Sequence, residues 1–248
     1  MKKLLELEEI KELFTEVQKS SIFSDQKQMA DAIPKLAVEE ILEKYNQEKN
    51  KVNFDLKNFV TTHFSFPESL KYDSSEHSKD IQEHIKKLWK HLSVSNPENQ
   101  GTLIGLPKPY VVPGGRFNEF FYWDSYFAML GLQVHNEVEL MENIVENCAF
   151  LINNYGKIPN GNRTYFLSRS QPPYFFIMLE LLAETLQNDN LIVQYLPILE
   201  KEYQYWMDPD EQKIIEFPDN VFLNRYFDKN NETIEKNYSI NIVHIEKE

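Results

Sequence analysis

The chain has 248 residues and a formal net charge of −13. This acidic balance disfavours nucleic acid and anionic membranes as partners, because phosphate groups are bound by basic surfaces. Seven glycines and a hydrophobic fraction of 42% favour a helical protein with a sizeable core over a turn-rich all-β fold.

The N-terminus and the cysteine content together predict a cytoplasmic protein. The first residues resemble the start of a signal peptide, but Glu6, Glu8 and Glu9 interrupt the apolar run that such a segment needs. No stretch of the sequence approaches the ~20 apolar residues of a membrane-spanning helix. The single cysteine, Cys148, rules out an intrachain disulfide and is typical of a reducing compartment.

Apolar residues at helical spacing predict a succession of helices along the chain. The first stripe covers residues 4–18, and the second begins at Val38. Later stripes predict further helices over 81–92, from about Trp123 onward, and over 137–153, 174–186 and 192–206. His84 and His91 flank one of these stripes, but no third ligand accompanies them, so we expect neither a metal site nor a cofactor.

Residues 113–126 combine glycines, charges and aromatic rings in the order Pro-Gly-Gly-Arg-Phe-Asn-Glu-Phe-Phe-Tyr-Trp-Asp-Ser-Tyr. The paired glycines allow a tight loop, and the residues that follow predict a buried helix. Trp123 and Asp124 then fall in the first turns of this helix, with Arg116 on the loop before it. Ring faces beside charged planar groups suit a sugar, but an aromatic-rich core helix with a capped start explains the same pattern.

A second dense stretch, residues 156–173, begins with Gly, Pro and Asn, which disfavour regular structure. It ends in Arg-Ser-Gln-Pro-Pro, where Ser170 suits a helix cap and the prolines suit a first turn. The start of the helix over 174–186 is therefore predicted to carry Arg169, Ser170 and Gln171. These side chains would face any ligand bound in an opening beside this helix. A purely structural cap is the alternative.

Residues 113–126 closely resemble the first signature of the trehalases, inverting glycoside hydrolases that split trehalose into two glucose molecules. Residues 21–34 and 156–173 also resemble trehalase segments, as do shorter stretches at 202–207 and 224–226, in the same order. The resemblance covers roughly residues 12–228. It implies an all-α fold that is part of an (α/α)6 barrel, incomplete in this chain, with one domain over 1–228 and a divergent polar tail over 229–248.

The resemblance also implies a trehalose-binding site, because several residues match family positions that contact the sugar. They are Arg116, Trp123, Asp124, Asn160, Arg169, Ser170 and Gln171.

No catalytic residue can be named from the resemblance. Inverting cleavage needs two carboxyl groups ~6.5–9.5 Å apart across the scissile bond, and the family segments that supply them do not appear in this sequence. Asp124 or Glu119 could be recruited, although positioning roles suit both better. The sequence therefore predicts the N-terminal half of a trehalase, inactive alone, with a possible companion chain that supplies the rest. Two alternatives remain: a sugar-binding protein without hydrolysis, and a helical interaction scaffold.

Overall fold

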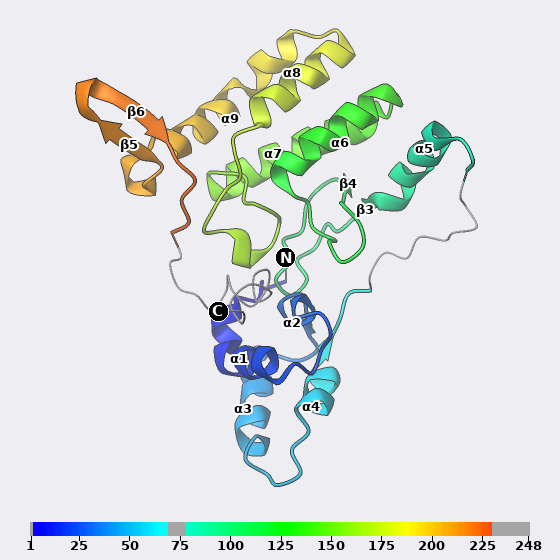
Figure 1. Cartoon of the computed structure of the whole chain (residues 1–248), viewed down its shortest axis with the longest axis vertical. Helices are drawn as coiled ribbons and strands as arrows, with labels where there is room; N and C mark the ends of the chain where they lie inside the picture. Colours follow the sequence, from blue (N-terminus) through cyan, green and yellow to red (C-terminus); the bar gives the residue numbers. More distant parts are fainter. Residues whose placement is uncertain (1, 69–77, 230–248) are drawn as a thin grey trace, which may run out of the picture. The chain divides into compact units, whose positions relative to one another are not determined.

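The computed structural model describes residues 2–68 and 78–229, and within them the chain is mostly helical, as predicted (Figure 1). It divides into two compact units, each described here by itself. The first holds the described residues of Met1–Glu68 and Glu98–Ile104, and the second those of Ser69–Pro97 and Gly105–Asn230. The predicted tail over 229–248 lies almost entirely outside the described residues, so the predicted domain boundary stays a prediction.

The first unit contains short helices and one small ladder. The 3-10 helix η1 spans Leu7–Ile10, and the α-helices are α1 (Lys11–Ser20), α2 (Lys27–Ala30), α3 (Val38–Glu48) and α4 (Leu56–His63). Strand β1 (Ile33–Pro34) pairs antiparallel with β2 (Phe64–Ser65). The predicted helix over 4–18 is thus a 3-10 turn followed by α1, because Ile10 leaves the helical region at φ −115° and ψ 21°.

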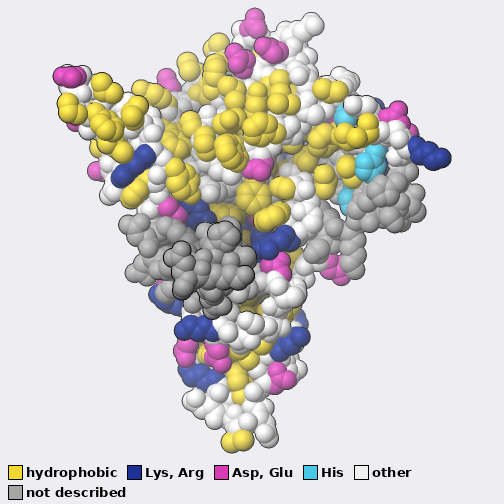
Figure 2. Space-filling model, in the orientation of Figure 1, with side chains coloured by type: hydrophobic (Ala, Val, Ile, Leu, Met, Phe, Trp, Pro, Cys, Tyr) yellow, Lys and Arg dark blue, Asp and Glu magenta, His cyan; other side chains and the backbone are white. Residues whose placement is uncertain are grey.

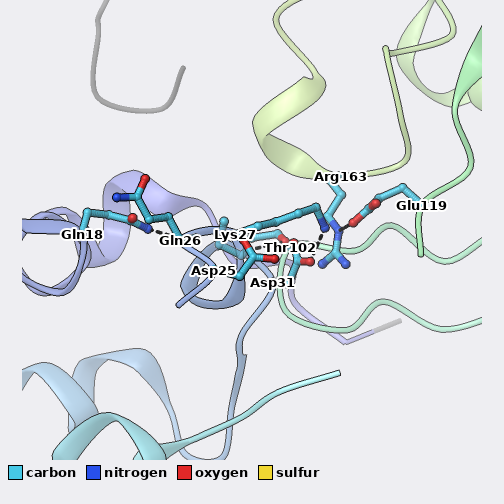
Figure 3. A network of polar contacts seen from close by, with 9 residues as sticks. Gln18, Asp25, Gln26, Lys27, Asp31, Thr102, Glu119 and Arg163 are labelled. Atoms are coloured by element: carbon cyan, nitrogen blue, oxygen red, sulfur yellow. Dashed lines mark hydrogen bonds and ion pairs between the residues drawn. The ribbon is translucent and has the colours of Figure 1, made fainter. Parts of the chain in front are cut away.

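Buried polar contacts hold the connection between α1 and α2 in the first unit (Figure 3). The helix α1 ends at Ser21, which is left-handed at φ 52°. Gln18 then donates a hydrogen bond of 2.9 Å to the carbonyl of Gln26, and Lys27 forms a buried ion pair with Asp31. This segment resembles trehalases in sequence. Within the first unit, its contacts hold the connection between α1 and α2 in place.

The second unit is built around the long helix α7 (Val138–Tyr155), which packs against α6 (Tyr122–Val134), α8 (Phe175–Leu186) and α9 (Asn190–Met207). Figure 1 shows these four helices running side by side. Along α7, nine residues are buried, including Ile144, Cys148 and Ile152. The helix ends at Gly156, whose φ of +73° is easily adopted by glycine.

Further elements of the second unit flank this helical core. The helix α5 (Ile81–Leu92) leads into strand β3 (Ser93–Val94), which pairs with β4 (Tyr110–Val111). The remaining elements are the 3-10 helices η3 (Thr164–Phe166), η4 (Pro209–Glu211) and η5 (Pro218–Asn220), and the strands β5 (Ile214–Phe217) and β6 (Val221–Asn224).

The antiparallel hairpin formed by β5 and β6 was not predicted. Its turn contains Asp219 and Asn220 at positive φ. Asn224, in the stretch 224–226 that resembles a trehalase segment, is the last residue of β6.

One face of the second unit carries exposed apolar side chains, visible as a hydrophobic area in Figure 2. The exposed large apolar side chains of the second unit include Phe127, Leu130 and Val134 on α6, Phe176 and Leu186 on α8, and Val193, Leu196 and Tyr203 on α9. Contiguous apolar surface of this kind marks contact sites or a tendency to aggregate.

A buried polar junction ties α6, α8 and α9 together. The Tyr122 hydroxyl donates to Glu202 Oε1 at 2.5 Å and accepts from the Phe175 backbone N–H at 2.8 Å. Burial raises the pKa of Glu202 to about 7, against the opposing effect of the Tyr122 hydrogen bond, which lowers it. Burial also raises the pKa of the Tyr122 hydroxyl and of the Cys148 thiol.

Replacing Gly101 by alanine should destabilise the first unit through both strain and a clash. Gly101 has φ +57°, and a Cβ there would lie 2.6 Å from the carbonyl oxygen of Ala32. Gly156→Ala is the matched control, because Gly156 also has positive φ but open space around the added methyl group. We expect Gly101→Ala to lower the free energy of unfolding by about 3 kcal/mol and Gly156→Ala by about 1 kcal/mol. Urea unfolding measures both, and equal losses would argue against the clash.

The Glu202 carboxyl should make stability fall with rising pH. Its pKa is about 7 in the folded chain against an ordinary value of 4.5, so between these values the folded chain binds more protons than the unfolded chain. The stabilisation is therefore complete below about pH 4.5 and lost as pH rises through about 7, an effect of about 3 kcal/mol.

Urea unfolding of the wild type and Glu202→Gln at pH 4 and pH 8 tests this expectation. The variant should gain stability relative to the wild type by about 3 kcal/mol more at pH 8 than at pH 4. An equal difference at both pH values would show that Glu202 does not titrate in this range.

Candidate functional site

The glycine-rich loop before α6 makes the tight turn that the sequence predicts. Gly114 and Gly115 have φ of +94° and +62°, and the Phe117 N–H donates to the Gly114 carbonyl at 3.2 Å. Arg116 is exposed on this turn, and its guanidinium carbon lies 5.4 Å from the centre of the Phe117 ring. The loop thus presents a cation at the surface.

The first turn of α6 is capped by groups from the second dense stretch. Its N-cap residue, Phe121, makes no side-chain cap, so the first N–H groups need other acceptors. The Tyr122 N–H donates to the Asn160 carbonyl at 3.2 Å, and the Trp123 N–H donates to Gln171 Oε1 at 3.0 Å. The two motifs that were separate in sequence therefore meet at this helix start.

Gln171 also reaches the carboxylate of Asp124. Its Nε2 donates to Asp124 Oδ2 over a longer distance of 3.4 Å. One carboxamide therefore contacts both of the adjacent residues Trp123 and Asp124. The carboxylate lies in the first turn of α6, where the helix dipole favours negative charge. Trp123, Asp124 and Gln171 are thus brought together at the start of α6.

Aromatic rings form a partly exposed wall beside Asp124. The Trp123 ring, 38% exposed, lies edge-to-face with Tyr174 and Phe127 at centroid distances of 6.0 and 6.5 Å. A cavity of about 260 Å³ is lined by Asp124, Phe127 and Pro113 among other residues. An apolar ring face next to a carboxylate is the combination that sugars need, since their C–H faces are apolar and their hydroxyls donate hydrogen bonds.

Arg169 is not presented to the cavity beside Asp124. Its side chain is buried, and Nη1 forms an ion pair of 3.1 Å with Asp228. The same nitrogen lies 3.4 Å from the Tyr165 carbonyl, and the guanidinium carbon lies 5.0 Å from the centre of the Phe166 ring. In this arrangement Arg169 anchors the loop before Gln171.

Ser170 does not cap the following helix, so that prediction was wrong. The helix α8 begins only at Phe175, and its N-cap, Tyr174, makes no side-chain cap. Ser170 is buried, and its hydroxyl donates to the Gln171 carbonyl at 3.0 Å. The segment from Gln171 to Tyr174 stays non-helical, in keeping with the constraint that a proline places on the residue before it.

Asn160 contributes its backbone to the site. Its carbonyl accepts from Tyr122, as described above, while its side-chain Oδ1 is buried and has no hydrogen-bond partner within residues 2–68 and 78–229. The side chain is therefore near the helix start without making a polar contact there.

A buried ion pair between Glu119 and Arg163 fixes the loop before α6 to the loop after α7 (Figure 3). Arg163 Nε lies 2.7 Å from Glu119 Oε1, and the side chains are 1% and 0% exposed. Asn162 adds a second link, because its Oδ1 accepts from the Phe120 N–H at 2.7 Å. Glu119 is therefore a positioning residue and is not accessible to a ligand.

Asn162 and Arg163 were missed in the sequence, although a signal was present. A carboxylate such as Glu119, placed among aromatic residues, needs a buried cation or several hydrogen-bond donors. Glu202 was also missed. It falls at helical spacing with Tyr195, Leu199 and Trp206, which places a carboxylate on the apolar face of α9.

A second cavity, of about 700 Å³, lies along α8 and α9. Its lining is largely apolar and includes Pro173, Phe176 and Trp206, with Glu200, Glu202 and Arg225 as charged members. No cluster of three or more His, Cys, Asp or Glu residues within the described ranges could hold a metal ion. No described helix has the length and apolar character to cross a membrane.

Comparisons with known proteins identify the family of this chain. The sequence model of the trehalase family matches residues 21–247. The periplasmic trehalase of Escherichia coli O45:K1 is 47% identical over 227 residues, which cover 87% of this chain and 40% of that protein. The periplasmic trehalase of Shigella flexneri serotype 5b is 46% identical with the same coverage. The chain thus spans about two fifths of the length of these relatives.

A solved structure of the neutral trehalase from Saccharomyces cerevisiae is also similar. It aligns with a TM-score of 0.37 and 33% sequence identity, over 52% of this chain and 26% of the yeast chain.

The predicted cytoplasmic location is contradicted, because the bacterial relatives are named periplasmic trehalases. The prediction failed because one cysteine cannot form an intrachain disulfide in any compartment, so the cysteine count does not separate reducing from oxidising surroundings. The fold prediction, by contrast, is confirmed, since this family has the (α/α)6 barrel fold and the chain is a partial, mostly helical member. The family model covers most of the sequence, and the chain belongs to the trehalase family.

Proposed function

We propose that this chain forms the sugar-binding part of an α,α-trehalase, a glycosidase that hydrolyses trehalose to two glucose molecules with inversion. The observation that carries the proposal is the contact of one carboxamide, on Gln171, with both Trp123 and Asp124. It joins the two motifs through Trp123 and Gln171, which lie 48 residues apart in the sequence. Membership of the trehalase family supports trehalose as the substrate class.

Each proposed contact uses a different property of the disaccharide. Asp124 is exposed, so its carboxylate can accept hydrogen bonds from two sugar hydroxyls, and bonds to an ionised group are roughly twice as strong as neutral ones. The exposed part of the Trp123 ring offers a surface for apolar C–H groups. Arg116, also exposed on the glycine turn, can donate to two neighbouring hydroxyls. Gln171 contacts the Trp123 backbone N–H and the Asp124 carboxylate, and it can share its carboxamide with the sugar.

The other three predicted residues are assigned supporting roles in this proposal. Arg169 and Ser170 hold the loop before Gln171 through the Asp228 ion pair and the Gln171 carbonyl. Asn160 supports the start of α6 through its backbone carbonyl. Any of the three would need to change its side-chain contacts to reach the sugar.

We propose that the acid and base for hydrolysis come from family sequence beyond these residues, in the same polypeptide or in a companion chain. Inversion needs one carboxylic acid and one carboxylate on opposite sides of the scissile bond. Glu119 is buried against Arg163, and Glu202 is buried against Tyr122, so neither suits this work. By the names of its relatives, the protein is proposed to act in the periplasm.

Calorimetric titration of the purified chain with trehalose tests the proposed site. Asp124→Ala and Arg116→Ala should each weaken trehalose binding by about tenfold or more, because each removes charge-assisted hydrogen bonds. Asp189→Ala is the control, since Asp189 is an exposed carboxylate at the start of α9 that makes no side-chain cap. Equal affinity in the wild type and Asp124→Ala would contradict the proposed contacts.

Glucose release separates the hydrolase from a sugar-binding protein. We expect that the chain alone binds trehalose without producing glucose. Glucose should appear when the remaining family segments are supplied. Sustained binding with no glucose in either case would favour a sugar-binding protein, and absence of binding would leave a helical scaffold.

A further inference from the structure

A single hydroxyl group joins three helices of the second unit next to the proposed sugar site. Tyr122 is the first residue of α6, and its hydroxyl contacts Glu202 on α9 at 2.5 Å and the N–H of Phe175, the first residue of α8, at 2.8 Å. Glu202 is only 4% exposed. The distance of 2.5 Å is at the short end of the range for O–H···O hydrogen bonds.

The start of α6 is joined to the segment before α8 a second time, through Trp123, the residue after Tyr122. The Trp123 N–H donates to Gln171 Oε1 at 3.0 Å, and Gln171 lies four residues before Phe175. The start of α6 is thus held to residues 171–175 by two adjacent hydrogen bonds. One of these bonds involves Gln171 directly, and the other involves the hydroxyl that Glu202 orients.

The electrostatic surroundings of Glu202 make its ionised side chain unfavourable for the stability of the folded chain. Within residues 2–68 and 78–229, Tyr122 from α6, Cys148 from α7 and Tyr205 on α9 itself interact with Glu202, and burial raises the pKa of all three. None of these three groups carries positive charge. The charged side chains of Glu200 and Arg225 line the same cavity as Glu202. A buried carboxylate in such a place is often less stable than an apolar side chain of similar volume.

We propose that Glu202 is a positioning residue for the sugar site. Through the Tyr122 hydroxyl it holds Trp123 and Asp124 in their arrangement with Gln171, and this local order is maintained at the expense of global stability. The inference rests on the proposed function only for its consequence on sugar affinity. The positioning effect itself is a property of the free chain.

Three variants of α9 separate positioning from a purely structural role. Glu202→Met keeps the volume but removes the acceptor for Tyr122, while Glu202→Gln keeps a neutral acceptor. Glu200→Gln is the matched control, because Glu200 is exposed, lies on the same helix and lines the same cavity. Three quantities are measured at pH 8 for each variant: hydrogen exchange of the Trp123 and Phe175 amides by NMR, the urea midpoint, and the dissociation constant for trehalose.

If Glu202 positions the sugar site, its replacement should lower local order and raise global stability. In Glu202→Met the two amides should exchange about tenfold faster and trehalose should bind about tenfold more weakly. The urea midpoint should nevertheless rise, because a buried charge is removed. Glu202→Gln should give the same pattern with about threefold changes, and Glu200→Gln should match the wild type.

A purely structural role predicts that local exchange follows global stability. Exchange at Trp123 and Phe175 that is unchanged or slower in the Glu202 variants would overturn the inference, as would an equal effect of Glu200→Gln. If Glu202→Met does not fold, the nearly isosteric Glu202→Gln decides by the same criteria. Absence of trehalose binding in the wild type would count against the proposed function alone, because the exchange data still decide the role of Glu202.

Discussion

The N–H groups at the start of α6 have no intrahelical partner, and the second unit supplies the acceptors they need. Phe121 makes no cap, so the Asn160 carbonyl and the Gln171 carboxamide take this role. A requirement of every helix end is thereby met by the loop that follows α7. The same contacts bring the Trp123 ring and the Asp124 carboxylate to one place. The same contacts therefore serve both the start of α6 and the proposed site.

Buried polar groups around this helix start show how the arrangement is kept in place. The Glu119–Arg163 ion pair fixes the loop before α6, and the Tyr122–Glu202 contact fixes the helix against α8 and α9. Such groups do little for net stability, because the loss of hydration offsets most of their attraction. Their contribution is to fix the geometry, because an arrangement that separated the partners would leave a buried charge without a partner.

The sequence was most informative where one local rule determined the structure. Helical spacing predicted α7 and α9, and the glycine loop with the apolar residues after it predicted Trp123 and Asp124 in the first turns of a helix. It was least informative where partners are distant in the chain. The ion pair of Arg169 with Asp228 joins residues 59 positions apart in the sequence, and no periodic pattern in the sequence predicts it. Ser170 has the composition of a cap, but α8 begins only at Phe175. The location was predicted wrongly because it was inferred from the cysteine count and the first residues, which do not determine it.

The most direct measurement of the central claim is an NMR titration of the chain with trehalose, which follows the indole N–H signals of the tryptophans and the side-chain amide of Gln171. The account predicts that the signals of Trp123 and Gln171 shift together at one saturating concentration, while the indole signal of Trp206, which lines the other cavity, does not respond. A titration that moves Trp206 instead, with Trp123 and Gln171 unchanged, would place the sugar in the cavity along α8 and α9 and contradict the account.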